Sequence, residues 1–232
     1  MPYLNYIISL LPSLVLSVPI VLFSLSLHEL SHGYVAYRLG DPTAKREGRL
    51  SLNPLRHLDP IGAISMVLFR FGWAKPVPVD CRYFKNPKRG MALVALAGPV
   101  ANLLLAIFFG AFSAGIETVY PILSTVLNPL FSYLFSLLYQ FGFIAHTMNL
   151  YLAVFNLIPI PPLDGSRILF AFLPDRYYFK VMRYERAIQM VLLLLIYFGF
   201  ADGFLSSLVS PISNGIMDFF LFLFQKIMYL LI

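Results

Sequence analysis

The stretch SLHELSHGYVAYRLG at residues 26–40 follows a long apolar run, NYIISLLPSLVLSVPIVLFSLS, at residues 5–26. A membrane-crossing helix needs about 20 apolar residues, so this run predicts a membrane span. His28, Glu29 and His32 stand near the end of that span. An ionisable side chain inside a membrane costs about 2.5–3.5 kcal/mol even on the gentler scales. Three such residues close together predict a compensating partner, and a metal ion is the simplest one.

The composition of the whole chain indicates an integral membrane protein. Of its 232 residues, 59% are hydrophobic and 12% are charged, and the mean hydropathy is +0.78. Soluble domains are about 25% charged. The first residues lack the pattern of a cleaved signal peptide, so we expect the first apolar run to be retained as a span. The single cysteine, Cys81, excludes an internal disulfide.

Basic residues are concentrated in two blocks, with 11 of the 17 Lys and Arg at 38–89 and five more at 167–186. Such blocks between apolar runs orient a membrane protein, because they remain in the cytoplasm. No basic patch stands apart from these loops, so we do not expect binding to nucleic acid. The blocks therefore predict a multi-pass protein whose polar loops face the cytoplasm.

The sequence predicts an all-α polytopic membrane protein of about five to six transmembrane helices, in a single domain covering residues 1–232. The apolar segments fall at about 12–39, 90–114, 119–140, 142–173, 186–206 and 212–232. Because Pro121, Asn128 and Pro129 make 119–140 a poor straight span, we expect that segment to be interfacial or re-entrant.

The charged segment 40–89 is expected to lie on the cytoplasmic side of the core and to hold short β-strands and loops. The pieces with strand character are GRLSLNP (48–54), AKPVPVD (74–80) and IGAISMVLF (61–69), of which the last is an edge strand or a segment dipping into the membrane. An exposed strand edge within 49–54 or 73–80 would be able to hold an unwound peptide by β-addition.

The spacing of the polar residues in HELSH suits a zinc site. Residues four apart lie one above the other on a helix, so His28 and His32 can offer two nitrogens to one ion. Glu29 lies about 100° round the helix, where it can reach a water molecule on the metal. This is the H-E-x-x-H arrangement of zinc hydrolases, with two ligands and a general base. The alternative is a helix whose polar residues face the interior of a bundle.

A third ligand is expected in FNLIPIPPLDGSRILF, residues 155–170. Its prolines and Gly165 must break the helix inside the membrane, and broken backbone is tolerated there only where it lines protein or a cavity. Asp164 and His32 both lie within roughly 10–17 Å of the same cytoplasmic boundary, at 1.5 Å per residue. Asp164 is therefore the candidate ligand, with a simple pairing to Arg167 as the alternative.

HELSH (28–32) and NLIPIPPLDG (156–165) together resemble the site-2 proteases, which are intramembrane zinc metalloproteases. GRLSLNPLRHLDPIG (48–62), GWAKPVPVD (72–80) and AGPVANLLLA (97–106) are similar to the compact prokaryotic branch of that family, without a PDZ or CBS domain. The likeness covers roughly residues 20–200. It implies one zinc ion held by His28, His32 and Asp164, with Glu29 as the catalytic base. It also implies a prokaryotic plasma membrane and an active site nearer its cytoplasmic face.

Three further residues are candidates for the site. Asn156 is a catalytic candidate, as a donor to the oxygen of the scissile carbonyl; the resemblance also points to it, and an interhelical hydrogen bond is the alternative. Asn102 follows Gly98-Pro99, an irregularity that is able to line the site; it is a candidate for the site mouth or for substrate contact, with a structural hydrogen bond between helices as the favoured alternative. His57 is a surface histidine or lies at the mouth of the site, where it can serve as a fourth ligand in a resting state.

The predicted function is zinc-dependent endopeptidase activity on membrane-anchored protein substrates, with bonds cut within or next to transmembrane helices. One alternative is a non-catalytic, zinc-binding relative that acts as a binding or chaperone protein. Another is a zinc transporter, or a zincin with a Glu as third ligand, but the later Glu117 and Glu185 lie outside any comparable motif. The substrate and the oligomeric state have no signal in the sequence.

Overall fold

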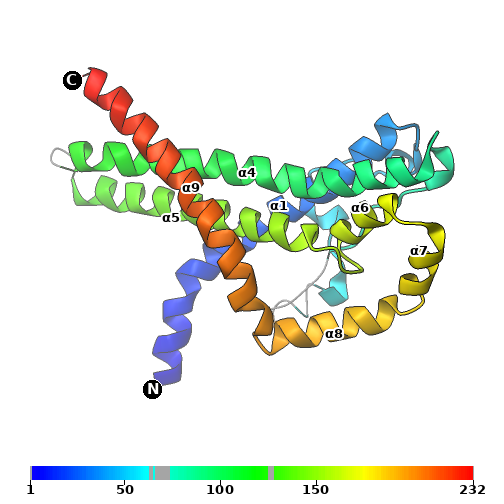
Figure 1. The fold of residues 1–232 in the computed structure, drawn as a ribbon. Coiled ribbons are helices and arrows are strands. Elements are labelled where there is room, and N and C mark those ends of the chain that lie inside the picture. Colours follow the sequence, from blue (N-terminus) through cyan, green and yellow to red (C-terminus); the bar gives the residue numbers. More distant parts are fainter. Residues whose placement is uncertain (1, 63–64, 66–73, 125–127, 232) are drawn as a thin grey trace. The chain divides into compact units, whose positions relative to one another are not determined.

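The computed structural model describes residues 2–62, 65, 74–124 and 128–231, most of which are α-helical (Figure 1). The α-helices are α1 (Pro2–Arg38), α2 (Thr43–Arg46), α4 (Pro87–Leu123), α5 (Pro129–Leu157), α6 (Asp164–Phe172), α7 (Asp175–Met182), α8 (Glu185–Tyr197) and α9 (Phe200–Leu231), and the 3-10 helices are η1 (Pro54–Arg56) and η2 (Cys81–Tyr83). The chain forms two compact units. Unit 1 comprises 1–22, 103–151 and 208–232, and unit 2 comprises 23–102 and 152–207.

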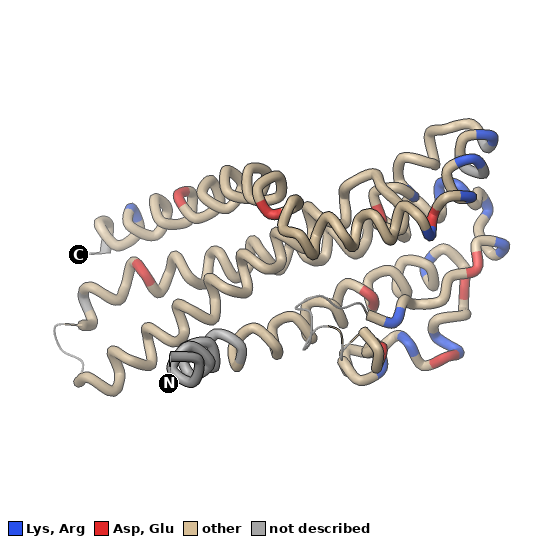
Figure 2. The backbone as a smooth tube through the Cα atoms, turned by 90° about the horizontal axis from the view of Figure 1, so that it is seen from below, with Lys and Arg blue, Asp and Glu red and all other residues tan. Residues whose placement is uncertain are grey.

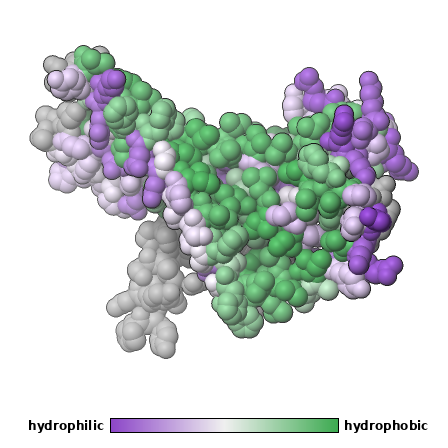
Figure 3. Space-filling model, in the orientation of Figure 1, coloured by the Kyte–Doolittle hydropathy of each residue, from purple (hydrophilic) through white to green (hydrophobic). Residues whose placement is uncertain are grey.

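The predicted helical membrane protein is confirmed in its class. Among the described residues, three helices are long and apolar enough to cross a membrane, over Val15–Arg38, Pro87–Pro121 and Phe200–Leu230. Hydrophobic residues cover much of the visible helical surface (Figure 3). The count of five to six spans stays a prediction.

The range 119–140, predicted to be interfacial or re-entrant, is not one element. It is divided between the end of α4 at Leu123 and the start of α5 at Pro129. Asn128 accepts a hydrogen bond from the backbone N–H of Phe131 at 3.1 Å, as an N-terminal cap does. Pro129 takes the first helical position, where its missing N–H costs nothing. Two of the three residues that make 119–140 a poor straight span therefore begin a long helix.

The predicted boundary between the last two helices is also displaced. The sequence predicts helices at 186–206 and 212–232, whereas α8 ends at Tyr197 and α9 begins at Phe200. Gly199 has a φ of +75°, a conformation that glycine adopts readily and that ends a helix. Pro211 lies inside α9 rather than at its start.

The segment 40–89 contains no strand among its described residues, which corrects the predicted strand segment. Its one pairing of strand type is an isolated antiparallel bridge between Leu58 and Ala74. Most of IGAISMVLF lies outside the described residues. The piece at 75–80 is extended, but Pro76 and Pro78 lack the N–H groups that a ladder needs. The predicted substrate-binding edge is therefore not part of a sheet here.

Unit 1 is held together by a buried polar cluster between its helices. In it, α4 and α5 run antiparallel and side by side (Figure 1). His146 of α5 is fully buried. Its Nδ1 donates to the carbonyl of Ala106 in α4 at 2.7 Å, and its Nε2 lies 2.9 Å from the hydroxyl of Ser213 in α9. Because a buried polar group needs partners, these bonds fix the register of the three helices.

Unit 2 carries the sequence motifs described above. The helix α1 ends at Arg38 and is followed by Gly40, whose φ is +107°. Asp41 N–H donates back to Ala36 O at 3.0 Å in a Schellman-type ending. Ala36 then packs with Phe84 and Val94 in a small apolar core that joins α1 to α4. Lys and Arg gather at the end of unit 2 where α1 ends and α4 begins (Figure 2).

Candidate metal centre

Helix α1 brings two imidazoles together on one face of unit 2. His28 and His32 are both buried, with 5% and 8% of their surface exposed. Since residues four apart share a helix face, the two Nε2 atoms lie 3.0 Å from each other. The regular helix is enough to produce this pair.

Asp164 completes the group from the other end of the sequence. The chain bends after α5 ends at Leu157, and Asp164 is the first residue of α6. Its Oδ2 lies 3.2 Å from His28 Nε2 and 3.3 Å from His32 Nε2. Gly165 makes the bend possible, because a Cβ there would clash with the carbonyl of Leu157. All three potential ligand atoms lie within 4.8 Å of one another.

The hydrogen bond made by Nδ1 of each imidazole determines whether its Nε2 can bind a metal ion. His32 Nδ1 lies 2.6 Å from the carbonyl oxygen of Val94, and His28 Nδ1 lies 2.6 Å from Oδ1 of Asn102. Both oxygens are acceptors, so both Nδ1 atoms carry hydrogen in the neutral rings. Each Nε2 is then left with a lone pair, which is the form that binds a metal ion.

These residues fit a zinc ion. Two bare nitrogens and a carboxylate oxygen converge, and Asp164 Oδ2 is buried without a hydrogen-bond donor. Three acceptors facing one another need a cation between them. Gly98 of α4 leaves the necessary room, because a Cβ there would lie 2.5 Å from His32 Nε2 and 2.6 Å from His28 Nε2. A His₂-carboxylate set is one of the ligand sets of catalytic zinc.

Glu29 lies beside this group but is not part of it. It is half-buried, and its Oε2 accepts a hydrogen bond from the backbone N–H of Val77 at 2.8 Å. Among the described residues, no hydrogen bond reaches its other oxygen, Oε1. One oxygen is therefore held in place while the other is available for proton transfer.

Asn102, a candidate for lining the site, lies next to one of the two imidazoles. It is completely buried in α4, and its Oδ1 is the acceptor for His28 Nδ1. Outer partners of this kind fix the tautomer and orientation of a ligating imidazole.

Replacement of Asn102 by leucine is expected to weaken zinc binding by about 10–100-fold, because His28 loses the acceptor that fixes its tautomer. Asn102→Asp keeps an acceptor and is expected to retain the metal. The measurement is competition for zinc between each purified variant and a chelator of known affinity. Equal zinc affinity in the leucine variant and the wild type would show that this hydrogen bond has no part in metal binding.

His57 and Asn156, the other two candidates, are not among the three potential metal ligands. His57 is buried, with 2% of its surface exposed, and its Nε2 donates to the carbonyl of Ser51 at 2.7 Å. It makes no contact with the three metal-ligand candidates in the described part of the chain. Asn156 lies in the last turn of α5, where its Nδ2 donates to the carbonyl of Leu152 at 3.0 Å.

Several contacts at the site carry no signal in the sequence. The carbonyl of Val94 and the amide of Val77 are backbone groups, so no side-chain pattern reveals them. Arg49 and Asp41 do carry a weak signal, as charged residues beside apolar segments. Both are buried.

The extended segment near Glu29 ends at Asp80, in a surface ion pair. Arg82 donates to both carboxylate oxygens of Asp80, with Nη2 2.7 Å from Oδ2. The side-chain hydrogen bonding by Arg82 and the backbone N–H of Arg82 both lower the pKa of the Asp80 carboxyl. Asp80 thus stays ionised and caps η2.

Comparisons with known proteins agree with this geometry. The model of peptidase family M50 matches residues 17–199. The chain is 40% identical over 230 residues to "Putative zinc metalloprotease YwhC" of Bacillus subtilis, which covers 97% of this chain and 96% of that protein. It is 32% identical over 186 residues to "Zinc metalloprotease MJ0392" of Methanocaldococcus jannaschii, covering 78% of this chain and 42% of that one.

A third relative is "Putative zinc metalloprotease Rip3" of Mycobacterium tuberculosis, 29% identical over 208 residues. The match covers 87% of this chain and 43% of that protein, so the chain spans less than half of the length of Rip3 and of MJ0392. No solved structure matches the chain. With the family match over most of its length and a full-length relative at 40% identity, the chain belongs to peptidase family M50, the site-2 proteases, and is a zinc metalloprotease.

Proposed function

We propose that this metalloprotease hydrolyses peptide bonds within or next to the transmembrane helices of membrane-anchored proteins. One observation carries the proposal. His28, Glu29 and His32 all lie on the part of α1, Val15–Arg38, that is long and apolar enough to cross a membrane. A peptide bond must therefore reach the metal centre at membrane depth, which a transmembrane substrate does without leaving the bilayer.

One zinc ion, in this proposal, is held by His28, His32 and Asp164. Bound there, zinc supplies Lewis acidity, which lowers the pKa of water towards neutrality and polarises a carbonyl group. The chain's own contribution is the fixed arrangement of its donors. The Val94 carbonyl and Asn102 hold the two rings with Nε2 towards the centre, and the bend before α6 holds Asp164 against them.

Glu29 is the general base. It follows His28 directly on α1, and its oxygen Oε1 is the one not held by Val77. Glu29 takes a proton from the attacking water and delivers it to the leaving amine, as a positioned carboxylate can. Both proton transfers use a side chain whose other oxygen stays hydrogen-bonded to Val77.

Asn156 is the donor to the developing oxyanion in this proposal. Within the described part of the chain its Nδ2 has one hydrogen bond, to the carbonyl one turn earlier in α5, so its second N–H is available for the substrate. Replacement by leucine is expected to lower kcat by about 10²–10³-fold with zinc content unchanged, as for other oxyanion donors. Single-turnover cleavage rates measure this, and an unaltered kcat would assign Asn156 a purely structural role.

The active site is proposed to lie nearer the cytoplasmic face of a prokaryotic plasma membrane. Arg38 ends α1, six residues after His32, and the Lys and Arg residues of unit 2 gather at that end of the helix (Figure 2). Clustered basic residues remain on the cytoplasmic side. The membrane-anchored substrate would meet the metal centre from within the surrounding bilayer.

The test is cleavage by the purified protein in lipid vesicles, with a panel of single-span substrates. Each substrate is paired with a soluble form that lacks its transmembrane helix. The proposal predicts zinc-dependent cleavage of membrane-anchored substrates and little cleavage of their soluble forms. Equal cleavage of both forms would show a metalloprotease without preference for membrane substrates, and zinc retention without any cleavage would support the non-catalytic alternative.

A further inference from the structure

An extended segment, Lys75–Asp80, passes beside the metal-binding part of α1, and we call it the strap. It approaches α1 closely, because a Cβ on Gly33 would lie 3.1 Å from a methyl carbon of Val77. Three backbone N–H groups tie the strap down. Lys75 donates to the carbonyl of His57 at 2.7 Å, Val77 to Glu29 at 2.8 Å and Asp80 to the buried carboxylate of Asp41 at 2.7 Å.

The sequence of the strap singles out one of these donors. Pro76 and Pro78 have no N–H. Val77 therefore supplies the only backbone donor between Lys75 and Val79, and that donor is bound to Glu29. The strap thus presents a single N–H to the catalytic carboxylate.

Arg49 holds the same part of the strap from the other side. Only 6% of its surface is exposed. Its Nη2 donates to the carbonyls of Lys75 at 2.6 Å and Pro76 at 3.1 Å, and its Nη1 donates to the carbonyl of Arg56. In the described part of the chain it makes no direct ion pair. A buried guanidinium with carbonyl partners alone needs a compensating negative charge close by.

Glu29 is a carboxylate bound to the same part of the strap, and one peptide group connects it to Arg49. The carbonyl of Pro76 and the N–H of Val77 belong to the same peptide unit. Arg49 donates to its oxygen, and its N–H donates to Glu29. A cation on the oxygen and an anion on the N–H polarise the peptide in the same direction, so each hydrogen bond strengthens the other.

We propose that Arg49 is a positioning residue for Glu29 and acts through the Pro76–Val77 peptide. Arg49 holds the strap so that the Val77 N–H fixes Glu29 Oε2, which leaves Oε1 in place for proton transfer. This inference rests on the proposed function and adds to it a residue that does not touch the substrate. The effect of Arg49 is therefore expected in kcat rather than in substrate binding.

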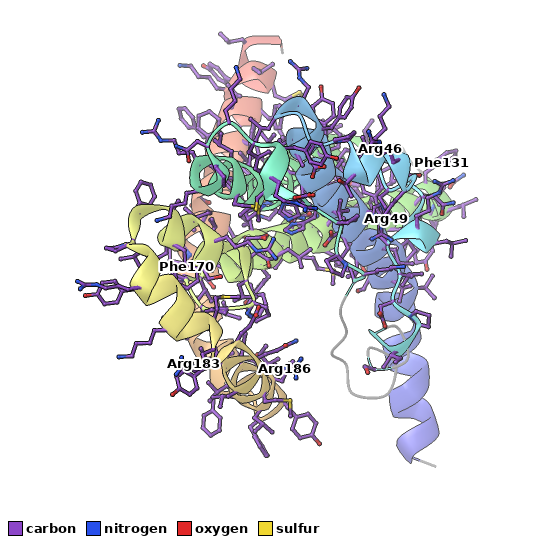
Figure 4. The ribbon with its side chains drawn as sticks, turned by 90° about the vertical axis from the view of Figure 1, so that its right-hand side faces the viewer. Arg46, Arg49, Phe131, Phe170, Arg183 and Arg186 are labelled. Carbon is purple, nitrogen blue, oxygen red and sulfur yellow. The ribbon has the colours of Figure 1, made fainter. Side chains whose placement is uncertain are left out.

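The first experiment compares Arg49→Gln with Arg46→Gln, which removes the same charge from an exposed position on α2 (Figure 4). Arg49→Gln is expected to lower kcat about 10–100-fold, as the loss of an outer partner does at metal sites. KM and zinc content should stay within about twofold of wild type. Arg49→Lys should give an intermediate kcat, because an ammonium does not reproduce the planar fork of guanidinium. Arg46→Gln should behave as wild type.

Rescue separates positioning from simple destabilisation. Arg49→Ala leaves a space shaped for a guanidinium group, so added guanidinium ion is expected to restore part of kcat in that variant and in no other. A variant that has lost activity by misfolding has no reason to respond. Absence of rescue in a folded, zinc-loaded Arg49→Ala protein would contradict the proposal.

The peptide itself is tested by placing the hydroxy acid analogue of valine at position 77. The ester removes the N–H donated to Glu29 and keeps every side chain. Its kcat is expected to fall about 10–100-fold. In the ester protein, Arg49→Gln should lower kcat only about twofold further, because the effects of two changes that act through one bond are not additive. Full additivity of the two changes would overturn the proposal.

Hydrogen exchange gives a readout independent of cleavage. A proteolytic fragment of residues 75–78 has one backbone amide, that of Val77, because Lys75 becomes its N-terminal amine and the other two residues are prolines. Loss of a bond to a charged group is expected to speed exchange about tenfold or more. Arg49→Gln and Glu29→Ala should both speed exchange of the Val77 amide, and Arg46→Gln should not.

The two proposals fail in different ways. If the wild type cleaves no substrate, the proposed function fails, while exchange that is unchanged in Arg49→Gln would reject the role of Arg49 alone.

Discussion

Glu29→Gln is expected to lower the cleavage rate by about 10²–10⁴-fold, which is the range for loss of a general base. Glutamine keeps the size of the side chain and an oxygen that accepts from Val77 N–H. It removes only the ability to take up a proton. Zinc content should therefore be unchanged, because Glu29 is not among the three potential ligands. The measurement is the initial rate of cleavage beside the metal content of the same sample.

A matched carboxylate serves as the control. Glu47 is exposed at the end of α2, and Glu47→Gln should cleave at the wild-type rate. Substantial cleavage by Glu29→Gln, with zinc bound, would assign the proton transfers to another group. Loss of zinc from Glu29→Gln would instead place the carboxylate among the ligands.

Asp164→Ala is expected to abolish both zinc binding and cleavage. The carboxylate supplies the negative charge of the ligand set, and its Oδ2 faces the two imidazole nitrogens. Without it, two neutral nitrogens remain, too few for a catalytic zinc site. Metal analysis should fall from one zinc per chain in the wild type to almost none. Added zinc should raise the Tm of the wild type and leave that of Asp164→Ala unchanged, since only a bound ligand stabilises a fold.

Two control variants make this result specific. Asp202→Ala removes an exposed carboxylate from the first turn of α9 and should keep its zinc. His57→Gln tests the predicted fourth ligand, and it should keep its zinc as well, because His57 is not among the three potential ligand residues of the described part of the chain. Zinc retained by Asp164→Ala at wild-type affinity would contradict the proposed ligand set. Zinc lost from His57→Gln would extend it.

The parts of the site that follow from local geometry can be predicted from the sequence. The i, i+4 spacing of His28 and His32 determines their common face once a helix forms, and the prolines before Asp164 require a bend. The prediction that Asp164 joins His28 and His32 rests on the family resemblance and on their similar depth below the cytoplasmic boundary. Neither source specifies how α4 lies against α1. The acceptors for the two imidazoles, Val94 and Asn102, depend on that register and so remained outside the prediction.

Helix boundaries were less predictable than helices. Hydropathy marks the apolar length of a segment but not the residue at which its backbone turns. Asn128 and Pro129 disfavour a helix when they lie inside it and favour one when they lie at its first turn. Gly199, not Pro211, separates the last two helices, because a positive φ ends a helix whereas a single proline can remain within one. The alternating prolines at 76 and 78 likewise suggest a strand, although they remove the N–H groups that strands share.

We propose above that the metal centre hydrolyses peptide bonds at membrane depth. The most direct test is to map the cleaved bond by mass spectrometry, in a single-span substrate reconstituted with the wild-type protein in lipid vesicles. Substrates whose apolar segment is shifted in steps along the chain locate that bond relative to the membrane. We expect a cut within or next to the apolar segment, which moves with the segment and disappears in Glu29→Gln. A cut that stays at one soluble sequence, wherever the apolar segment is placed, would contradict it.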